Sequence, residues 1–377
     1  MHVLTDEVQQ VSELARQFAE AELRPHVERW DREAALDAHV LQELAELGFF
    51  GMLAPESAGG MEFGVPAYVA ALEALAWGEP TVALVLAMHT AFGIRPLLAH
   101  GTAGQQSAWL GALASGERIA CLALSEAGAG SDLTAMHTRA ERTAGGWRLT
   151  GRKQWVSGAG LANLGLVVAR TAPAGEKGHG AVGVFLVPME LPGVSVGGRK
   201  ETLGLKPLPF ADVVFENVEL PADAALGAAT GGAEEIHEGM ELARLGIAAQ
   251  AVGIADAALG HALAYADQRE QFDTRLRDFE GVQYKLADMA TRLEAARALL
   301  WRAALEPTTL SAAMAKLFAS EAAMWCATQA VQIFGGYGYM RDYPVEKLMR
   351  DAKATEIYES TNEMQRRAIA RELYATG

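Results

Sequence analysis

The sequence predicts an α+β protein whose chain runs from helices to strands and back to helices. Apolar residues recur at spacings of three and four near the N-terminus, Gly- and Pro-bounded apolar runs fill the middle, and the helical spacing then returns. A chain of 377 residues is long enough for two or three packed units. We expect a helical domain over 1–116, a β-barrel or sandwich over 117–222, and a four-helix bundle over 223–377.

The N-terminal region carries a one-sided apolar stripe, typical of an amphipathic helix. This stripe consists of Val8, Val11, Leu14, Ala15, Phe18 and Ala21. Further along, the apolar run from Thr81 to Ile94 contains His89 and is shorter than the roughly 20 residues needed to span a bilayer. We therefore expect this run to be a buried helix.

The middle region reads as strands separated by turns. Ala181–Val187 and Ala211–Leu220 are rich in β-branched and apolar residues, and Gly145-Gly146 lies between two polar strands as a hairpin turn would. Several strands at short intervals favour a small barrel or sandwich over alternating β-α units.

The C-terminal region has the apolar spacing of a helix bundle. Its predicted seam consists of Val282, Leu286, Met289, Leu293, Ala296 and Leu300. Small residues crowd 243–259 and suit close helix packing, while Arg244 and Asp256 within that stretch argue against a membrane span.

Composition narrows the classes of partner. The formal net charge of −15 opposes a broad basic surface for nucleic acid or anionic lipid. The two cysteines, Cys121 and Cys326, form no disulfide framework or zinc motif, and the nine histidines are scattered. We expect a cytoplasmic protein with no nucleic-acid, membrane or metal partner.

Glu359 is the candidate catalytic acid or base. It lies behind Ile357 and Tyr358 in the segment 356–363, where burial would raise its pKa toward the range of a working base. Taken alone, this pattern is more typical of a solvated acid at a helix terminus.

Three other features each allow a structural and a functional interpretation. The Gly128–Ser131 loop lets backbone N–H groups approach a flavin or phosphate, but it lacks the third glycine of a dinucleotide fingerprint and equally suits a tight turn. Trp155 is more often a barrel core residue than a cofactor contact. Glu241 and Arg244, three residues apart, are typical of an ion pair along a helix.

Five motifs together resemble the acyl-CoA dehydrogenases, flavoproteins that desaturate acyl thioesters. The resemblance covers essentially the whole chain, and its motifs are 122–132, 153–157, 269–272, 332–338 and 358–361. It implies a helical N-terminal domain, a middle β domain and a C-terminal four-helix bundle, which agrees with the three regions inferred from spacing.

The resemblance implies an FAD site shared between subunits of a homotetramer. The expected cofactor-binding residues are Leu122, Ala123, Leu124, Ser125, Gly130, Ser131, Trp155, Val156, Ser157, Arg269, Phe272, Phe279, Gln332, Gly336, Thr361 and Glu363. Among these, Arg269 is expected to bind the pyrophosphate of a neighbouring subunit's FAD, a task suited to a guanidinium.

The resemblance also implies the reaction. Glu359 would remove the α-proton of an acyl-CoA while flavin N5 takes the β-hydride, giving a trans-2-enoyl-CoA, and an electron-transfer flavoprotein would accept the electrons. A backbone N–H at Glu359 would polarise the thioester carbonyl. Some relatives carry the base at the position of Ala243, which cannot serve here. The expected substrate-binding residues are Ser131, Glu241, Arg244, Tyr358 and Arg371.

The chain departs from the family pattern at three positions. Ser360 and Asp273 stand where glycine is usual, and Glu280 stands where a glutamine is common. Two alternatives stay open: a flavoprotein oxidase of the same fold acting on acyl-CoA or nitroalkanes, and a non-catalytic flavin-binding relative. Nitroalkane oxidases use an aspartate base, so glutamate argues against that activity. A nucleic-acid-binding relative would need a basic C-terminal extension.

Overall fold

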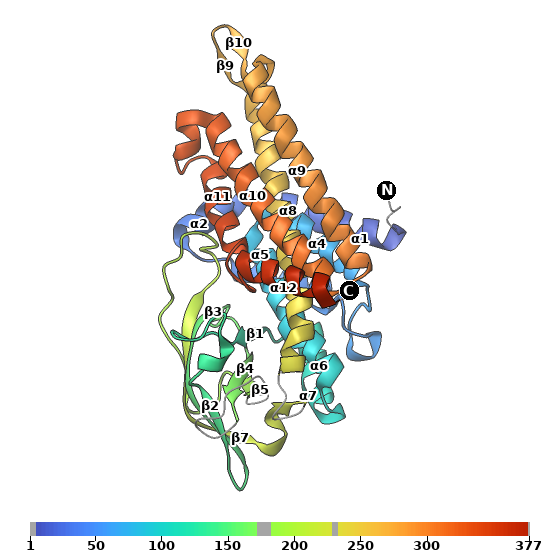
Figure 1. Ribbon diagram of the computed structural model, residues 1–377, viewed down its shortest axis with the longest axis vertical. Helices are drawn as coiled ribbons and strands as arrows, with labels where there is room; N and C mark the ends of the chain where they lie inside the picture. Colours follow the sequence, from blue (N-terminus) through green and yellow to red (C-terminus); the bar gives the residue numbers. More distant parts are fainter. Residues whose placement is uncertain (1–4, 172–181, 228–232, 376–377) are drawn as a thin grey trace.

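The structure, a computed structural model, describes residues 5–171, 182–227 and 233–375. Helices from the two ends of the chain pack together, and the sheet lies at one end of this helical body (Figure 1). The order of helices, strands and helices agrees with the predicted α+β fold.

The N-terminal helices bury the predicted stripe. They are α1 (Asp6–Phe18), α2 (Val27–Glu33), α3 (Ala38–Glu46), α4 (Val65–Gly78), α5 (Pro80–His89), α6 (Arg95–His100) and α7 (Ala103–Ala114). The Thr5 hydroxyl accepts from Val8 N and caps α1. Two residues of the stripe depart from the prediction. Leu14 is 40% exposed because it points off the narrow buried face, and Ala21 is exposed because it lies beyond α1, in the π-helical turn Ala19–Leu23. The domain boundaries predicted at 116/117 and 222/223 stay predictions.

The apolar run from Thr81 to Ile94 is buried throughout, as predicted. His89 within it contacts Leu113 O at 3.1 Å and Ala120 N at 3.2 Å, and burial lowers its pKa to about 4. Two helical stretches are long and apolar enough to cross a membrane, Pro80–His100 and Glu235–Gln268. Their most apolar windows are 83% and 89% buried inside the protein, which is typical of core helices.

Eight strands of the described chain form one curled sheet. They are β1 (Ala120–Ala123), β2 (Arg139–Arg142), β3 (Gly146–Ser157), β4 (Leu164–Arg170), β5 (Val182–Pro188), β6 (Val194–Val196), β7 (Phe210–Pro221) and β8 (Ala225–Leu226). The order is β6-β7-β3-β2-β4-β5-β8, with β1 parallel to β4. The strand predicted over 211–220 is present as β7, whereas Ala181 lies outside the described residues.

The sheet surrounds a core of its own, as a barrel does. Trp147 of β3 meets Phe185 of β5 edge-on, with ring centroids 5.1 Å apart. The predicted hairpin turn joins β2 to β3, where Thr143 N donates to Gly146 O and Gly146 has a φ of 154°. A register shift in the β3–β7 pairing falls between Lys153 and Val156, and this irregularity positions Trp155.

The C-terminal region forms the predicted bundle and shares its core with the N-terminal helices. Its elements are α8 (Ala233–Gln268), β9 (Glu270–Gln271), β10 (Thr274–Arg275), α9 (Glu280–Leu305), α10 (Thr309–Phe334), η10 (Gly335–Tyr339), α11 (Pro344–Thr355) and α12 (Asn362–Ala375). The seam of α9 is buried from Met289 to Leu300. At Gly253 a Cβ would lie 2.4 Å from Glu73 O, so this glycine lets α8 approach α4 closely.

Buried ion pairs attach α11 to the rest of the protein. Lys347 Nζ lies 2.9 Å from Glu79 and 2.6 Å from Asp351. Arg350 pairs with Asp31 of α2 at 2.7 Å, and Leu205 N donates to Asp351 Oδ1 at 2.6 Å. The helix that leads to Glu359 is therefore fixed to both the N-terminal helices and the loop before β7.

Candidate active site

Glu359 lies in the short loop between α11 and α12. Its backbone φ is 49° and that of Ser360 is 78°, so two consecutive non-glycine residues are left-handed. Such conformations are rare and cluster at functional sites. Within the described part of the chain, no acceptor faces the backbone N–H of Glu359, which leaves it able to polarise a ligand carbonyl.

Burial raises the pKa of Glu359 to about 7, although Lys316 and Arg244 both act to lower it. The cations come from α10 and α8, so three elements converge on one carboxyl group. A carboxyl group of this pKa exchanges a proton near neutral pH, as a general base must. The structure therefore favours the functional interpretation of Glu359 over the solvated helix-terminus acid.

Arg244 is the second unusual group at this centre. Its Nε and Nη1 atoms are buried and find no hydrogen-bond partner among the described residues. Burial lowers its pKa, and the nearby Glu241 and Glu359 oppose that shift. Buried N–H groups without acceptors are costly, so they are typical of a site that receives a ligand oxygen. Ala243, the alternative position for a base, is fully buried.

The hydroxyl group of Tyr358 is used inside the protein. It donates to Gln250 Oε1 of α8, and Gln250 Nε2 in turn donates to Pro80 O at 2.7 Å. Glu241 is similarly engaged, because it accepts from the Thr309 hydroxyl and lies 3.5 Å from His237. The polar atoms that make these bonds are therefore occupied. A ligand could still contact the ring of Tyr358 and the remaining atoms of Glu241.

Trp155 is not a barrel core residue. It has a φ of 55° and is 55% exposed, whereas Lys153 and Val156 on either side are buried. The irregular pairing with β7 turns the indole outward, and Gln154 N donates to Ser125 O at 2.8 Å. The exposed ring therefore lies on a strand that is attached to the Gly128–Ser131 loop.

The loop after β1 is held by a buried ion pair. Lys153 Nζ donates to Glu126 Oε1 at 2.8 Å and to Leu124 O at 2.9 Å. Glu126 also accepts from the backbone N–H groups of His137 and Thr138. Burial lowers the pKa of Lys153 to about 8 despite Glu126. The glycines of this loop face open space, since a Cβ at Gly128 or Gly130 would meet nothing within 4 Å.

The other residues predicted to bind the flavin or the substrate differ in how exposed they are. Ala123 and Val156 have buried side chains, so only their backbone groups are available to a ligand. Leu122, Leu124, Ser125 and Ser157 are partly exposed, and Gly130 and Ser131 are exposed. Thr361 caps α12 by accepting from Met364 N at 3.4 Å, and the exposed Glu363 and Arg371 lie on that helix.

A second group of predicted cofactor residues lies at the far end of the bundle from the sheet, around β9 and β10 (Figure 1). Phe272 is 91% exposed with a φ of 57°, and Gln332 and Gly336 are also exposed. The Arg269 guanidinium lies 5.4 Å from the Tyr337 ring centroid and forms no ion pair within the described chain. The structure therefore does not bring this group together with Glu359 in one chain.

Two of the departures from the family pattern also lie at this end. Asp273 follows Phe272 in the hairpin and has a φ of 56°, the left-handed conformation for which glycine is best suited. The exposed Glu280 accepts from the Tyr284 hydroxyl at 2.5 Å, and the partly exposed Phe279 precedes α9. The carboxylate of Glu280 thus has a partner of its own.

Both groups of residues fit the expected FAD. On one side are an exposed indole and open glycines. On the other are an arginine without a carboxylate partner and exposed aromatic rings, which suit a pyrophosphate and an adenosine.

Sequence reasoning missed Lys316, which contacts the Glu359 loop from α10. The available signal was a lysine within a helix of small apolar residues, where Ala312, Ala313, Ala315 and Ala319 are all buried. It also missed the pairing of Lys153 with Glu126, which connects residues 27 positions apart. Neither partner can be identified from spacing along one helix or strand.

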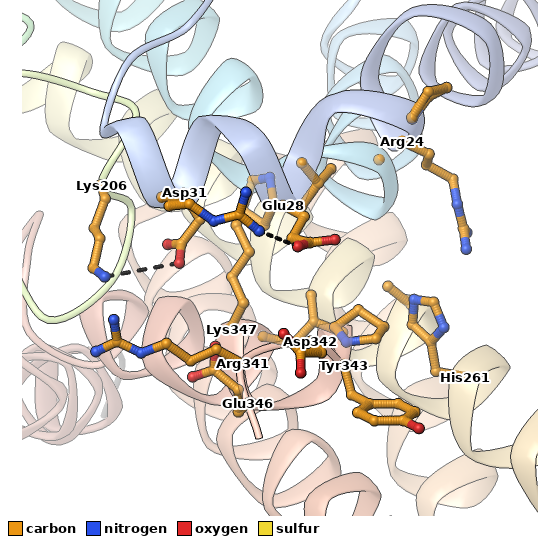
Figure 2. Close-up of a pocket in the computed structure, with 18 of the residues that line it drawn as sticks. Arg24, Glu28, Asp31, Lys206, His261, Arg341, Asp342, Tyr343, Glu346 and Lys347 are labelled. Carbon is orange, nitrogen blue, oxygen red and sulfur yellow. Dashed lines mark hydrogen bonds and ion pairs between the residues drawn. The ribbon is translucent and has the colours of Figure 1, made fainter. Parts of the chain in front are cut away.

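A separate cavity of about 550 Å³ lies between α2, α8 and the start of α11 (Figure 2). Its walls carry ion pairs, among them Asp31 with Lys206 at 3.7 Å and Glu28 with Arg32. The residues predicted for catalysis or cofactor binding do not line it. Elsewhere, Glu22, His39 and Glu43 bring possible ligand atoms within 4.8 Å of one another, a grouping that is common among exposed acids without a metal.

Three relatives illustrate what this chain is similar to. The human mitochondrial short-chain specific acyl-CoA dehydrogenase is 39% identical over 367 residues, covering 96% of this chain and 89% of the relative. Butyryl-CoA dehydrogenase from Megasphaera elsdenii superposes with a TM-score of 0.96 at 36% identity, over 99% of this chain and 100% of that one. A structure described as the electron transferring flavoprotein of Acidaminococcus fermentans contains a chain with the same TM-score and identity, covering 99% of both chains.

Matches to known domains cover most of the sequence. Residues 5–117 match the acyl-CoA dehydrogenase N-terminal domain, residues 121–218 match the middle domain, and residues 230–374 match the C-terminal domain. These matches follow the order of helices, sheet and bundle seen in the structure. The chain therefore belongs to the acyl-CoA dehydrogenase family.

Proposed function

We propose that Glu359 removes the α-proton of a short-chain acyl-CoA, the first event in forming a trans-2-enoyl-CoA. The protein is an FAD-dependent acyl-CoA dehydrogenase, as its family membership shows. The observation that carries the choice of base is the position of Glu359 between Lys316 and Arg244, with a pKa raised to about 7 by burial. When bound, FAD supplies an acceptor for the hydride that leaves the β-carbon.

The surroundings of Glu359 explain how so weak an acid as an α-C–H can be deprotonated. A base of raised pKa is a stronger proton acceptor, and it is still partly ionised at neutral pH. The backbone N–H of Glu359 is available to the thioester oxygen and would stabilise the charge that develops there. Arg244 offers two further buried N–H groups to an oxygen of the substrate.

The acyl chain is proposed to be short because two relatives of similar length act on such substrates by name. These are the human short-chain specific enzyme and the Megasphaera butyryl-CoA dehydrogenase. The Acidaminococcus structure supports an electron-transfer flavoprotein as the electron acceptor. Both cysteines are free and buried, which suits a reducing compartment, and we place the enzyme in the cytoplasm.

A homotetramer built from two-fold dimers is proposed: the family resemblance implies the tetramer, and the separation of the two groups of cofactor residues supports the dimer. Arg269 and Phe272 lie on a hairpin at the far end of the bundle from the sheet that carries Trp155. Pairing of two chains about a two-fold axis would bring the hairpin of one to the flavin side of the other, because the same contact repeats in both directions.

Anaerobic reduction of the bound flavin by a panel of acyl-CoA thioesters tests this function. We expect butyryl-CoA to bleach the flavin fastest, and longer or branched thioesters to react more slowly. Glu359→Gln should slow the reduction by at least about 10³-fold, since it removes the base and keeps the shape of the side chain. Glu321→Gln, which changes a half-buried carboxylate on α10 that pairs with Arg366, is the matched control and should react at the wild-type rate. Undiminished reduction in Glu359→Gln would exclude Glu359 as the base.

A further inference from the structure

Lys316 is a lysine with no exposed surface, and its contacts are all within the protein. Its Nζ donates to Ser360 O at 2.8 Å and to Asn362 Oδ1 at 3.0 Å. Asn362 Nδ2 in turn lies 3.0 Å from the hydroxyl of Ser320, one turn further along α10. These bonds attach the loop that carries Glu359 to the centre of the bundle.

Burying an ammonium group costs desolvation free energy, and an apolar residue at this position of α10 would avoid that cost. Lysine is almost never fully buried unless it is paired. Lys316 makes no direct ion pair among the described residues, and its hydrogen bonds go to a carbonyl and an amide oxygen. The cost of burying the charge therefore calls for a compensating role.

The loop held by Lys316 is the strained one. Ser360 O accepts from both Lys316 Nζ and Gln365 Nε2, the latter at 3.1 Å. Both bonds act on the left-handed residue that directly follows the base, at a φ of 78°. Without them, the peptide after Glu359 would lose the contacts that keep it in this conformation.

We propose that Lys316 is the positioning residue of the catalytic base. Its ammonium fixes the peptide after Glu359 and provides the positive charge that favours the ionised carboxylate. This inference rests on the proposed function of Glu359, and it adds a residue from a different helix to the machinery of proton removal.

The charges around the pair agree with this role. Arg244 of α8 faces both groups, and Glu356 and Glu363 approach Lys316 from the two sides of the loop. Burial lowers the pKa of Lys316 to about 8, while Glu359 acts to raise it, so the ammonium is protonated at neutral pH. A guanidinium is not deprotonated in proteins, so Lys316, rather than Arg244, is the titratable cation beside the base.

The test is the pH dependence of flavin reduction by butyryl-CoA in the FAD-loaded enzyme, followed anaerobically from about pH 5.5 to about pH 9. Lys316→Met removes the charge, so the acid limb of the profile should move to higher pH by about one unit, with about fivefold slower reduction at neutral pH. The rate should recover as the pH rises. Lys316→Arg keeps the charge and should keep the limb near its wild-type position.

Two further variants separate charge from structure. Ser320→Ala weakens the same hydrogen-bonded group without removing a charge, so it should leave the position of the limb unchanged. Lys316→Gln can still donate to Ser360 O and carries no charge, so it should shift the limb as Lys316→Met does, and it replaces that variant if methionine prevents folding. FAD content and thermal unfolding are measured for every variant.

The outcomes distinguish this inference from the proposed function. Normal flavin reduction in Glu359→Gln would overturn the assignment of the base itself. Loss of reduction in Glu359→Gln combined with a wild-type acid limb in both neutral Lys316 variants would overturn the role of Lys316 alone. A uniform fall in rate at all pH values, with no shift of the limb, would also overturn it, because a merely structural lysine behaves in that way.

Discussion

The centre around Glu359 and the hairpin around Phe272 differ in how much of a site one chain builds. Glu359 is surrounded by Arg244, Lys316 and the ends of two helices, and its loop is held by buried hydrogen bonds. The hairpin presents Phe272 91% exposed, beside an arginine that pairs with no carboxylate in the described chain. The first region is enclosed by residues of its own chain, whereas the second is exposed.

This difference separates chemistry from cofactor retention. Proton removal requires groups held at fixed positions, and these are supplied by the shared core of the two helical regions. An exposed aromatic ring and an unpaired cation gain little in an isolated chain, because water surrounds them. They would become useful if a second copy covered them, which is the physical reason for the proposed contribution of the hairpin to a neighbouring chain's cofactor.

Mixing two inactive variants tests whether the Glu359 centre of one chain works with the hairpin of another. We expect this experiment to give the largest effect. Glu359→Gln lacks the base, and Arg269→Ala should lose FAD because a guanidinium–phosphate contact is removed. In mixed dimers, one of the two shared sites would combine Glu359 and Arg269 from different chains. Co-expression at equal levels should therefore restore about a quarter of the wild-type activity.

Arg275→Ala is the matched control for the hairpin, because Arg275 is already paired with Asp267 at 3.3 Å. It should keep its FAD and its activity. If Arg269 instead served the site of its own chain, every mixed dimer would lack an intact site and co-expression would restore nothing. The specific activity and flavin content of the co-purified mixture measure the result.

Replacing Lys347 tests how far the Glu359 centre depends on the rigidity of α11. Lys347→Met would leave Glu79 and Asp351 buried without their cation, so we expect a loss of about 3–5 kcal/mol in the free energy of unfolding. Lys353→Met, on the same helix but exposed, should change this free energy by less than about 0.5 kcal/mol. Denaturant unfolding of the two variants at equal FAD loading measures the difference, and equal losses would contradict a structural role for the buried pair.

Much of the fold could be predicted because it depends on local spacing. The α1 stripe and the α9 seam follow from apolar periodicity, and the β2–β3 hairpin follows from two glycines. The outward turn of Trp155 could not be predicted from its strand pattern, since a pairing irregularity with β7 decides it. The spacing of its own strand indicated a core residue, and the exposed ring shows that this was wrong, while the flavin contact implied by the family motif stays a prediction.

The candidate site was predictable in its chemistry but not in its supports. The motif predicted Glu359 as the base, a role that stays a prediction, whereas the pattern alone favoured a solvated acid; the structure adds the burial that raises the pKa of Glu359. Lys316 and Gln250 act on the loop from positions 44 and 108 residues away, respectively. Such contacts join elements that are distant in sequence, so no local pattern encodes them.

The raised pKa of Glu359 predicts that ionisation of its carboxyl group lowers the stability of the folded protein. No such loss is expected at the exposed hairpin. Its pKa rises from an ordinary value of 4.5 to about 7 on folding, so folding is disfavoured progressively as the pH increases between these values. Glu359→Gln stays neutral and should exceed the wild type by about 1–3 kcal/mol at pH 8, with little difference near pH 4.5. Denaturant unfolding at both pH values measures this, and an equal difference at the two would contradict a buried ionisation.

The smallest expected effect is a change in stability on introducing glycine at the two positions where relatives usually carry it. One of these positions lies in each region. Ser360 has a φ of 78° and Asp273 a φ of 56°, so both side chains occupy left-handed backbone. Ser360→Gly should stabilise the protein by about 0.5–1 kcal/mol, because the loop keeps its bonds from Lys316 and Gln365 and loses the strain. Asp273→Gly should change stability by less than about 0.5 kcal/mol. Aspartate tolerates the left-handed conformation, so little strain is relieved, and glycine loses more conformational entropy than aspartate on folding.

Ser115→Gly provides the control, because the exposed Ser115 has a φ of −77° and carries no such strain. It should be neutral or destabilising, as glycine usually is where the backbone is already relaxed. If Ser360→Gly lowers the melting temperature as Ser115→Gly does, the serine hydroxyl contributes more than the strain costs. The left-handed loop would then be maintained by contacts of the Ser360 side chain, and the rigidity of the Glu359 centre would not depend on its buried carbonyl bonds alone.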